Sequence, residues 1–368
     1  MMKESASMEI TRIAKSYSLQ GYKVFTLSIG DTHFGLPDPI KLRLNKAIEE
    51  NKTHYLDSMG LPALRMDISR FEFQEAYLQD EILIVPGVKQ GLFYFLEAFE
   101  GKKIAILEPA WLGYHSICKM TGKEIIPINM KKEGWLDKLA SISFDALLVC
   151  TPNNPDGTVF SESEIKQLAS YCDKNQACLI IDEIYAEYSF DHSVKSMLKP
   201  YYSQENVVVM NGFSKAYAAT GLRIGYVATH NPVWNKRMNA VHQNTATCAN
   251  SLAQFAFLNY HESHSIVQQY ASYYRENRDL VCEIIPELEE MKPQGGFYFF
   301  IDLNRFGISD AEEFSRRILT DIKIALVPGS AYGTGFDSYV RLSYSLDRDE
   351  LREGIQLLKK YLQDYESE

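Results

Sequence analysis

Two basic residues stand eight positions apart in the stretch NGFSKAYAATGLRIGY (211–226). Small residues surround Lys215 and Arg223 there, and small residues let a backbone pass close to a ligand. A lysine amine can form a Schiff base with an aldehyde, and an arginine can hold a phosphate through paired hydrogen bonds. One ligand that carries an aldehyde and a phosphate would engage both residues together.

Other short apolar runs end on side chains able to take part in the same chemistry. AIL is followed by Glu-Pro-Ala-Trp111, LLVC leads to Asn154, and LII is followed by Asp182 with Tyr185 three positions later. Ligands of open α/β sheets bind beyond the carboxyl ends of the strands. We therefore expect these side chains to meet Lys215 at one edge of one sheet.

A pyridine ring with an aldehyde, a phenolic oxygen and a phosphate would use all of them. A buried Asp182 keeps the ring nitrogen protonated, so that the ring accepts electrons. Asn154 and Tyr185 can hydrogen-bond the ring oxygen, and Trp111 can stack on the ring. These residue types predict pyridoxal phosphate as the cofactor.

The phosphate needs amide donors at the start of a helix as well as a cation. IVPGVKQGLFYFLEAF (84–99) supplies the donors, because Pro86-Gly87 turns the chain and the amides of Val88 and Lys89 open an apolar helix. Arg223 supplies the cation.

The elements that carry these residues alternate along the chain. Amphipathic stretches such as 161–175, which opens with the capping pair Ser161 and Glu164, separate short apolar runs. The runs are KKIAILEPAW (102–111), DALLVCTPNNP (145–155), ACLIIDEIY (177–185), NVVVMNGFSK (206–215) and RIGYVATH (223–230). This order predicts an α/β fold whose central sheet is mostly parallel and has helices on both faces.

The C-terminal part has a different rhythm. A long helix is expected over 269–291, strands at 295–303, 323–330 and 338–345, and a closing helix over 349–365. We expect a large cofactor-binding domain over residues 36–261. A smaller α+β domain is expected from residues 1–35 and 262–368.

Composition excludes several classes of protein. The chain has 368 residues and a formal net charge of −10, which argues against a nucleic-acid-binding surface. No apolar run reaches the roughly 18 residues of a membrane span, and the N-terminus lacks the apolar core of a signal peptide, so a cytoplasmic protein is expected. The six cysteines show no metal-ligand spacing and are expected to be free thiols, with no metal site.

GFSKAYAATGLRIG resembles the pyridoxal-phosphate lysine motif of the class I/II aminotransferases at every constrained position. YLDSMGLPALR (55–65), TPNNPDG, DEIY, QGGFYFF and YVRLSYS are similar to further segments of that family and occur in its order. The resemblance runs from about residue 8 to the C-terminus. It implies a fold type I transferase that forms a homodimer with active sites shared between subunits.

The resemblance also implies roles for individual residues. Lys215 would be the Schiff-base lysine and acid/base, and Asp182 and Tyr185 complete the implied catalytic set. Substrate would be bound by Arg341, which takes the α-carboxylate, with Gly30, Asn154 and Trp111 beside it. The implied cofactor-binding residues are Lys215, Asp182, Tyr185, Asn154, Trp111, Arg223, Val88, Lys89, Ser214 and, from the partner subunit, Tyr55.

Three segments depart from the family pattern. Gly212 stands where many members have a serine that binds phosphate, which leaves the cofactor one hydroxyl short. Asp156 replaces the threonine of the Asn-Pro-Thr-Gly loop. The segment that usually covers the substrate carries Asp31, Thr32 and His33, so the identity of the substrate is open.

Amino transfer between an amino acid and an α-keto acid is the expected reaction. Other reactions use the same scaffold, and β-elimination from cysteine-type substrates, decarboxylation and ring closure stay open as alternatives. A non-catalytic regulatory domain is a third possibility. The acidic chain offers no basic DNA-binding module to support it.

Overall fold

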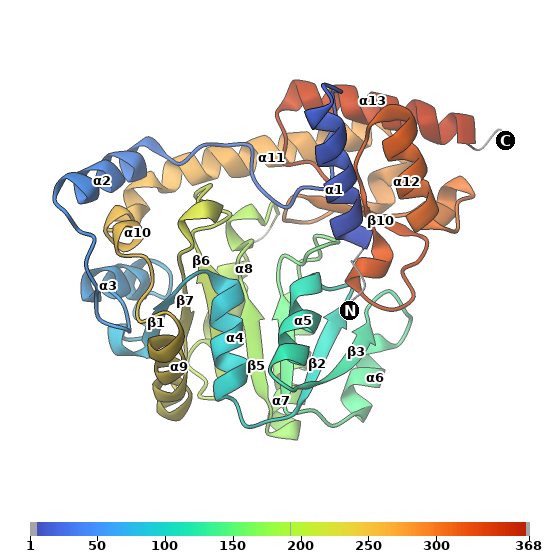
Figure 1. Cartoon of the computed structure of the whole chain (residues 1–368). Coiled ribbons are helices and arrows are strands. Elements are labelled where there is room, and N and C mark those ends of the chain that lie inside the picture. The colour runs from blue at the N-terminus through green and yellow to red at the C-terminus, as the bar shows by residue number, and fades with distance from the viewer. Residues whose placement is uncertain (1–5, 192, 366–368) are drawn as a thin grey trace.

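The computed structural model describes residues 6–191 and 193–365. Figure 1 shows a large sheet with helices on both faces, and a smaller sheet above it that packs with α1, α12 and α13. The strands are β1 (Ile82–Val85), β2 (Lys103–Glu108), β3 (Glu124–Asn129), β4 (Ala146–Cys150), β5 (Cys178–Asp182), β6 (Val207–Gly212), β7 (Gly225–Ala228), β8 (Tyr298–Asp302), β9 (Val327–Pro328) and β10 (Tyr339–Ser343). The helices are α1 (Ala6–Leu19), α2 (Asp38–Glu49), α3 (Pro62–Phe71), α4 (Val88–Ala98), α5 (Leu112–Met120), α6 (Trp135–Ser141), α7 (Glu162–Asn175), α8 (Val194–Leu198), α9 (Pro232–Thr245), α10 (Ser251–Ala256), α11 (His264–Ile284), α12 (Ala311–Ile322) and α13 (Arg348–Tyr365).

The large sheet has the strand order β1-β7-β6-β5-β4-β2-β3. β7 pairs antiparallel with both of its neighbours, and the other strands all run in one direction. The predicted fold class, a mostly parallel sheet, is confirmed. Because β7 is reversed, the residues just before it lie at the same edge as the carboxyl ends of its neighbours.

Each central strand is buried on both faces, which explains why the strands are apolar throughout rather than alternating. In β5, Cys178 and Ile180 belong to the core on the side of α4 and α5, whereas Leu179 and Ile181 belong to the core on the side of α7. The two-residue period therefore places Asp182 on the α5 side.

The smaller sheet has the order β8-β10-β9 and is antiparallel. Ile10 and Ala14 of α1 pack on Leu319 of α12 and on Ala325. One apolar core continues from α4 and α5 of the large sheet into the small sheet and α13. A single apolar core thus extends from the large sheet to the small one.

Two strands of the large sheet are missing from the sequence-based prediction. β1 has only four residues and leads at once into the Pro86-Gly87 turn. β3 contains Pro127 and a partly exposed side-chain pattern, and it pairs with β2 alone. Both are edge strands of the sheet. β1 is apolar and buried but very short, whereas β3 departs from the apolar pattern of a buried strand.

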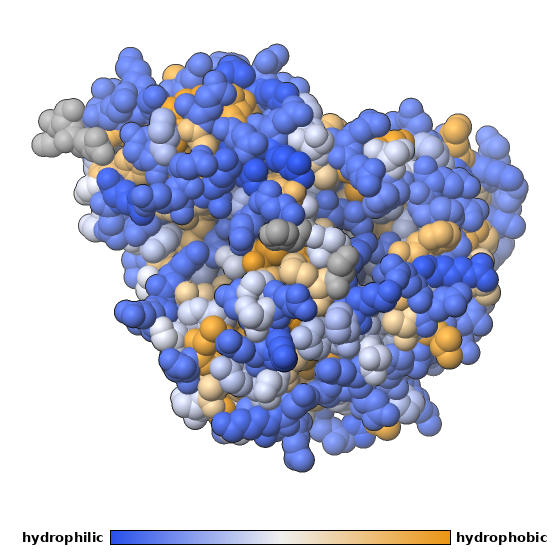
Figure 2. Space-filling model, turned by 180° about the vertical axis from the view of Figure 1, so that it is seen from behind, coloured by the Kyte–Doolittle hydropathy of each residue, from blue (hydrophilic) through white to orange (hydrophobic). Residues whose placement is uncertain are grey.

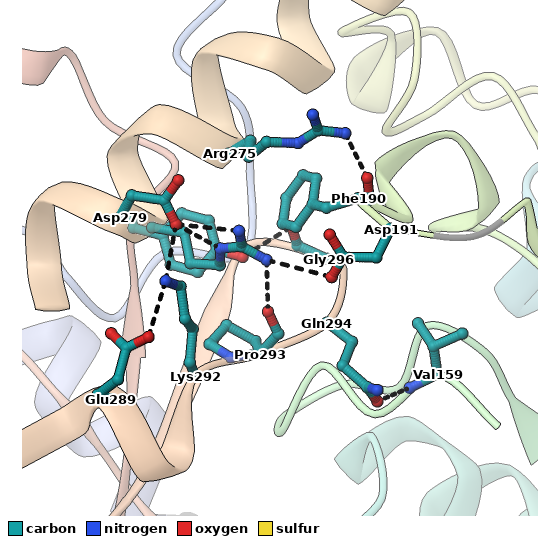
Figure 3. Close-up of polar contacts among 12 residues, drawn as sticks. Val159, Phe190, Asp191, Arg275, Asp279, Glu289, Lys292, Pro293, Gln294 and Gly296 are labelled. Atoms are coloured by element: carbon teal, nitrogen blue, oxygen red, sulfur yellow. Dashed lines mark hydrogen bonds and ion pairs between the residues drawn. The ribbon is translucent and has the colours of Figure 1, made fainter. Parts of the chain in front are cut away.

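Residues 293–296 join the small sheet to loops of the large one. The amides of Gln294 and Gly295 donate to the carbonyl of Gly157, at 3.1 and 3.0 Å. Arg278 donates to the Pro293 carbonyl at 3.1 Å and lies over the Phe190 ring at 4.8 Å. Figure 3 shows Arg275 reaching from α11 toward Phe190, and Gln294 reaching toward Val159.

The surface is mostly hydrophilic on the face opposite to Figure 1. Figure 2 shows hydrophobic side chains there in small groups among hydrophilic ones. Among the described residues, no helix has the length and apolar character needed to cross a membrane. All six cysteines are free, as expected, and five of them are buried.

Candidate active site

Lys215 lies just beyond the carboxyl end of β6. The Tyr188 hydroxyl donates to the Lys215 carbonyl at 3.0 Å and fixes the turn that presents the lysine. The Lys215 amine donates to the Gly30 carbonyl at 2.5 Å. Burial lowers the pKa of Lys215 to about 8, so a sizeable fraction of the amine is neutral near physiological pH.

Asp182 ends the neighbouring strand β5, and its side chain is buried. It accepts hydrogen bonds from the Tyr114 hydroxyl at 2.7 Å and from the Ile184 amide at 3.1 Å. Burial raises the pKa of Asp182 to about 6, and the two hydrogen bonds oppose that rise. Burial removes the water that would stabilise the ionised form, and a cation in its place would keep the Asp182 carboxylate ionised.

A chain of hydrogen bonds leads from Tyr185 to Arg341. The Asn154 amide nitrogen donates to the Tyr185 hydroxyl at 3.4 Å, and Arg341 Nη1 donates to the Asn154 carbonyl oxygen at 3.2 Å. The Tyr298 hydroxyl lies 3.1 Å from that of Tyr185. Asn154 thus touches both the tyrosine expected at the cofactor and the arginine expected at the substrate.

Arg341 is buried with donors left over. Its Nη2 donates to the Ser28 carbonyl at 2.7 Å, and the guanidinium stacks on the Tyr298 ring at 4.2 Å. Its Nε has no hydrogen-bond partner among the described residues. A buried guanidinium with an unpaired N–H matches the needs of a carboxylate ligand.

The other end of the site is built from backbone. Gly87 has φ 87° and turns the chain into α4, whose N-terminus has no side-chain cap. Arg223 leads into the reversed strand β7, and its Nη1 donates to the Thr220 carbonyl at 2.8 Å. A Cβ on Gly87 would lie 2.6 Å from Arg223 Nη2, so the Arg223 guanidinium lies next to the start of α4. Uncapped amides beside a cation form an anion site.

The family model for class I and II aminotransferases matches residues 22–358. The chain belongs to the class I and II aminotransferases. It is therefore an enzyme that transfers an amino group from an amino acid to a keto acid, and its family implies pyridoxal phosphate as cofactor.

This aminotransferase is similar to named proteins over nearly its whole length. The aspartate aminotransferase of Pyrococcus abyssi is 30% identical over 364 residues, covering 93% of this chain and 92% of the relative. Aromatic-amino-acid aminotransferase 2 of Thermococcus litoralis is 28% identical over 379 residues, covering 96% of each. A double mutant of Thermus thermophilus aspartate aminotransferase has a TM-score of 0.89 at 28% identity, covering 98% of this chain and 97% of that one.

Four residues named from the aminotransferase resemblance stand at the margin of the site. Trp111 is half-buried at the start of α5, and the Lys89 amine lies 5.4 Å from the centre of its ring. Ser214 is buried beside Lys215. Tyr55 is 82% exposed.

Two of the departures from the aminotransferase pattern now have a local explanation. A Cβ on Gly212 would lie 2.8 Å from the Cα of Gly225, so β6 and β7 leave no room for a side chain there. Asp156 is buried, accepts a hydrogen bond from Asn153 at 2.8 Å and pairs with Lys131 at 2.7 Å. Its carboxylate closes the loop that carries Asn154.

Sequence reasoning missed two tyrosines and one threonine that folding brings into the site. Tyr114, Tyr298 and Thr220 contact Asp182, Tyr185 and Asp31 respectively. For Tyr114 the sequence held a signal, because it follows Trp111 by three positions at the start of α5, and the centres of the two rings lie 5.2 Å apart. Tyr298 comes from the small sheet, and no sequence spacing connects it with Tyr185.

Proposed function

We propose that this aminotransferase binds pyridoxal phosphate between Lys215 at one end and the start of α4 with Arg223 at the other. The residues fit the cofactor: an amine of lowered pKa, a buried carboxylate and an uncapped helix start occupy one sheet edge. Their common location at that edge is the observation that carries the proposal. When bound, pyridoxal phosphate supplies an aldehyde and a ring that accepts electrons from the substrate Cα.

The chain's own residues then divide the work. Asp182 would pair with the ring nitrogen, Asn154 and Tyr185 with the ring oxygen, and Trp111 would cover the ring. The amides of Val88 and Lys89 would hold the phosphate with Arg223 and Ser214. Lys215 Nζ would take the proton from the substrate Cα, a role suited to an amine whose pKa is about 8.

Arg341 favours amino transfer over decarboxylation. The α-carboxylate would bind its free guanidinium N–H groups next to Asn154 and Gly30, and a carboxylate held in this way is one that the reaction keeps. The amino acid and keto acid would use the same arginine in turn.

The proposal includes a homodimer and two domains. Tyr55 is too exposed to serve its own site and would reach the phosphate of the partner subunit's site. Residues 36–261 would form the large domain, and residues 1–35 with 262–368 the small one. The contacts of Phe25 with Ile324 and of Leu27 with Ser343 support placing the N-terminal segment with the small sheet.

The test is the Lys215→Ala variant of the full-length enzyme. We expect loss of turnover and of the visible absorbance of the lysine-linked cofactor, because the variant lacks the amine that would form the Schiff base. Lys166→Ala, at an exposed site on α7, is the matched control and should leave both unchanged. Substantial turnover by Lys215→Ala would sink the assignment.

Product analysis separates transfer from elimination. Transfer requires a keto acid and forms one new amino acid for each one consumed, with no ammonia. Elimination would release ammonia without a keto acid. Because the similar proteins are named for aspartate and for aromatic amino acids, a donor panel should span both kinds of side chain.

A further inference from the structure

Residues 27–34, here called the N-terminal strap, run across the site from the small sheet. The Ser343 amide donates to the Leu27 carbonyl at 2.7 Å, and the Ser345 hydroxyl donates to the Asp31 carbonyl at 2.5 Å. Further along the strap, the hydroxyls of Thr32 and Tyr274 lie 2.5 Å apart. The backbone of the strap is therefore held by β10, the segment after it, and α11.

The Asp31 side chain points the other way, toward the loop that carries Lys215. Its Oδ2 accepts a hydrogen bond from the Thr220 hydroxyl at 3.0 Å, and its Oδ1 accepts one from the Thr32 amide at 2.8 Å. The preceding carbonyl, that of Gly30, accepts the hydrogen bond from the Lys215 amine. Two consecutive strap residues thus contact the lysine and its loop.

In addition to burial, four charged groups affect the pKa of the Lys215 amine. Asp31 raises the pKa of Lys215 more than Asp182 does, whereas Arg341 and Arg223 lower it. Asp182 is assigned to the cofactor ring, and the two arginines to the anionic groups of the ligands. Asp31 is the charge in this set that the proposed function leaves without a role.

We propose that Asp31 is a positioning residue for Lys215. The Asp31 carboxylate, held by the Thr220 hydroxyl, stabilises the ammonium that forms when the Lys215 amine takes a proton. The inference rests on the proposed function, because it requires Lys215 to be the reacting amine. Because Asp31 belongs to the N-terminal strap, proton uptake by Lys215 is favoured when the strap is held by the hydrogen bond between Asp31 and Thr220. An opposite charge near an amine favours its protonated form.

Asp31→Asn tests the charge, and Asp31→Glu is the conservative variant that restores it. In cofactor-free full-length protein, the rate at which trinitrobenzenesulfonate labels Lys215, followed by mass spectrometry, gives the pH midpoint of the amine. We expect Asp31→Asn to lower that midpoint by about half a unit or more, and Asp31→Glu to bring it back toward wild type. Thr220→Val, which keeps the charge but frees the side chain, should give a smaller decrease.

The holoenzyme supplies a second readout. The pH profile of kcat should shift in the same direction in Asp31→Asn, a change that a merely structural role would not produce. Melting temperatures check that each variant folds. If Asp31→Asn does not fold, the Asp31→Glu and Thr220→Val variants still test the proposal. An unchanged labelling midpoint in the folded variants would overturn the proposal.

Failure of the proposed function gives a different result. Borohydride reduction of the wild-type holoenzyme should attach the cofactor to the peptide that contains Lys215. If the label is absent, the proposed function fails. If the label is present while Asp31→Asn leaves the midpoint unchanged, only the role of Asp31 fails.

Discussion

Burial determines the reactivity of Asp182 and Lys215. The pKa of Asp182 rises to about 6 and that of Lys215 falls to about 8, each mainly because its charged form has lost water. The hydrogen bond from Tyr114 keeps the Asp182 pKa from rising further. A carboxylate that is costly to ionise alone is suited to a cationic partner such as a protonated pyridine ring.

Asp182→Asn should therefore stabilise the cofactor-free protein while it inactivates the enzyme. In the wild-type protein the folded-state pKa of Asp182 is about 6, above the reference value of 3.8. The contribution of this carboxyl group to stability is therefore fully present below pH 3.8 and is lost as the pH rises through 6. The variant should gain up to about 3 kcal/mol in the free energy of unfolding above pH 6, and the gain should fade toward pH 4.

Urea unfolding of the cofactor-free proteins across this pH range measures the gain. Glu283→Gln, at an exposed position on α11, is the control for removal of a carboxylate away from the site. A variant that is less stable than wild type at pH 7 would contradict the argument that Asp182 is held at a cost.

At the scale of elements, the proposed phosphate site depends on backbone segments in close contact. A Cβ on Gly225 would lie 3.1 Å from the Val88 nitrogen and 3.0 Å from the Asn211 carbonyl oxygen. β6, β7 and the start of α4 thus pack without intervening side chains. This spacing brings the uncapped amides of α4 close to Arg223.

Gly212→Ser is the substitution that would restore the serine of many family members. The new Cβ would lie 2.8 Å from the Gly225 Cα and 3.0 Å from the Ile224 carbonyl oxygen. We expect a loss of about 1–3 kcal/mol in stability and weaker cofactor binding, because two backbones must separate. Melting temperatures with and without cofactor measure both effects.

Gly221→Ser is the matched control in the same motif, where a Cβ meets nothing within 4 Å. It should change the melting temperature little. If Gly212→Ser instead bound cofactor more tightly at an unchanged melting temperature, the spacing of β6 and β7 would not be limiting.

At the scale of the whole molecule, the site belongs to two sheets. Lys215 and Asp182 come from the large sheet, whereas Arg341 lies on β10 of the small sheet and Gly30 on the strap. The shared core and the hydrogen bonds from the amides of Gln294 and Gly295 to the Gly157 carbonyl fix the two sheets against each other. The groups proposed to bind the cofactor and those proposed to bind the substrate are thereby held at fixed positions relative to each other.

Hybrid dimers test the proposed role of the partner subunit. Tyr55→Phe should weaken cofactor binding by about 10- to 100-fold if its hydroxyl bonds the phosphate. Mixing it with Lys215→Ala should create one site per hybrid with Lys215 from one subunit and Tyr55 from the other. That site should bind cofactor with wild-type affinity, as measured by titration of the visible absorbance.

The homodimers of each single variant are the controls, and neither should contain such a site. A mixture without any wild-type-affinity site would show that Tyr55 does not act across subunits.

The sequence alone determined the sheet edge and the residues that meet there. Asp182 follows an apolar run directly, and Asn154 and Lys215 follow theirs within a few residues. A parallel sheet brings the ends of such runs together whatever the connecting helices are. The cofactor and the family followed from the same short motifs. Local signals of this kind depend on neighbours in the chain.

Tertiary structure decided what depends on contacts between distant segments. The short edge strands β1 and β3 became recognisable by pairing, and the hydrogen bonds of Tyr298 with Tyr185 and of Asp31 with Thr220 join residues 113 and 189 positions apart. Steric room at Gly212 depends on the path of β7. The pKa values of Asp182 and Lys215 likewise follow from burial, which is a property of the packed molecule and not of the local sequence.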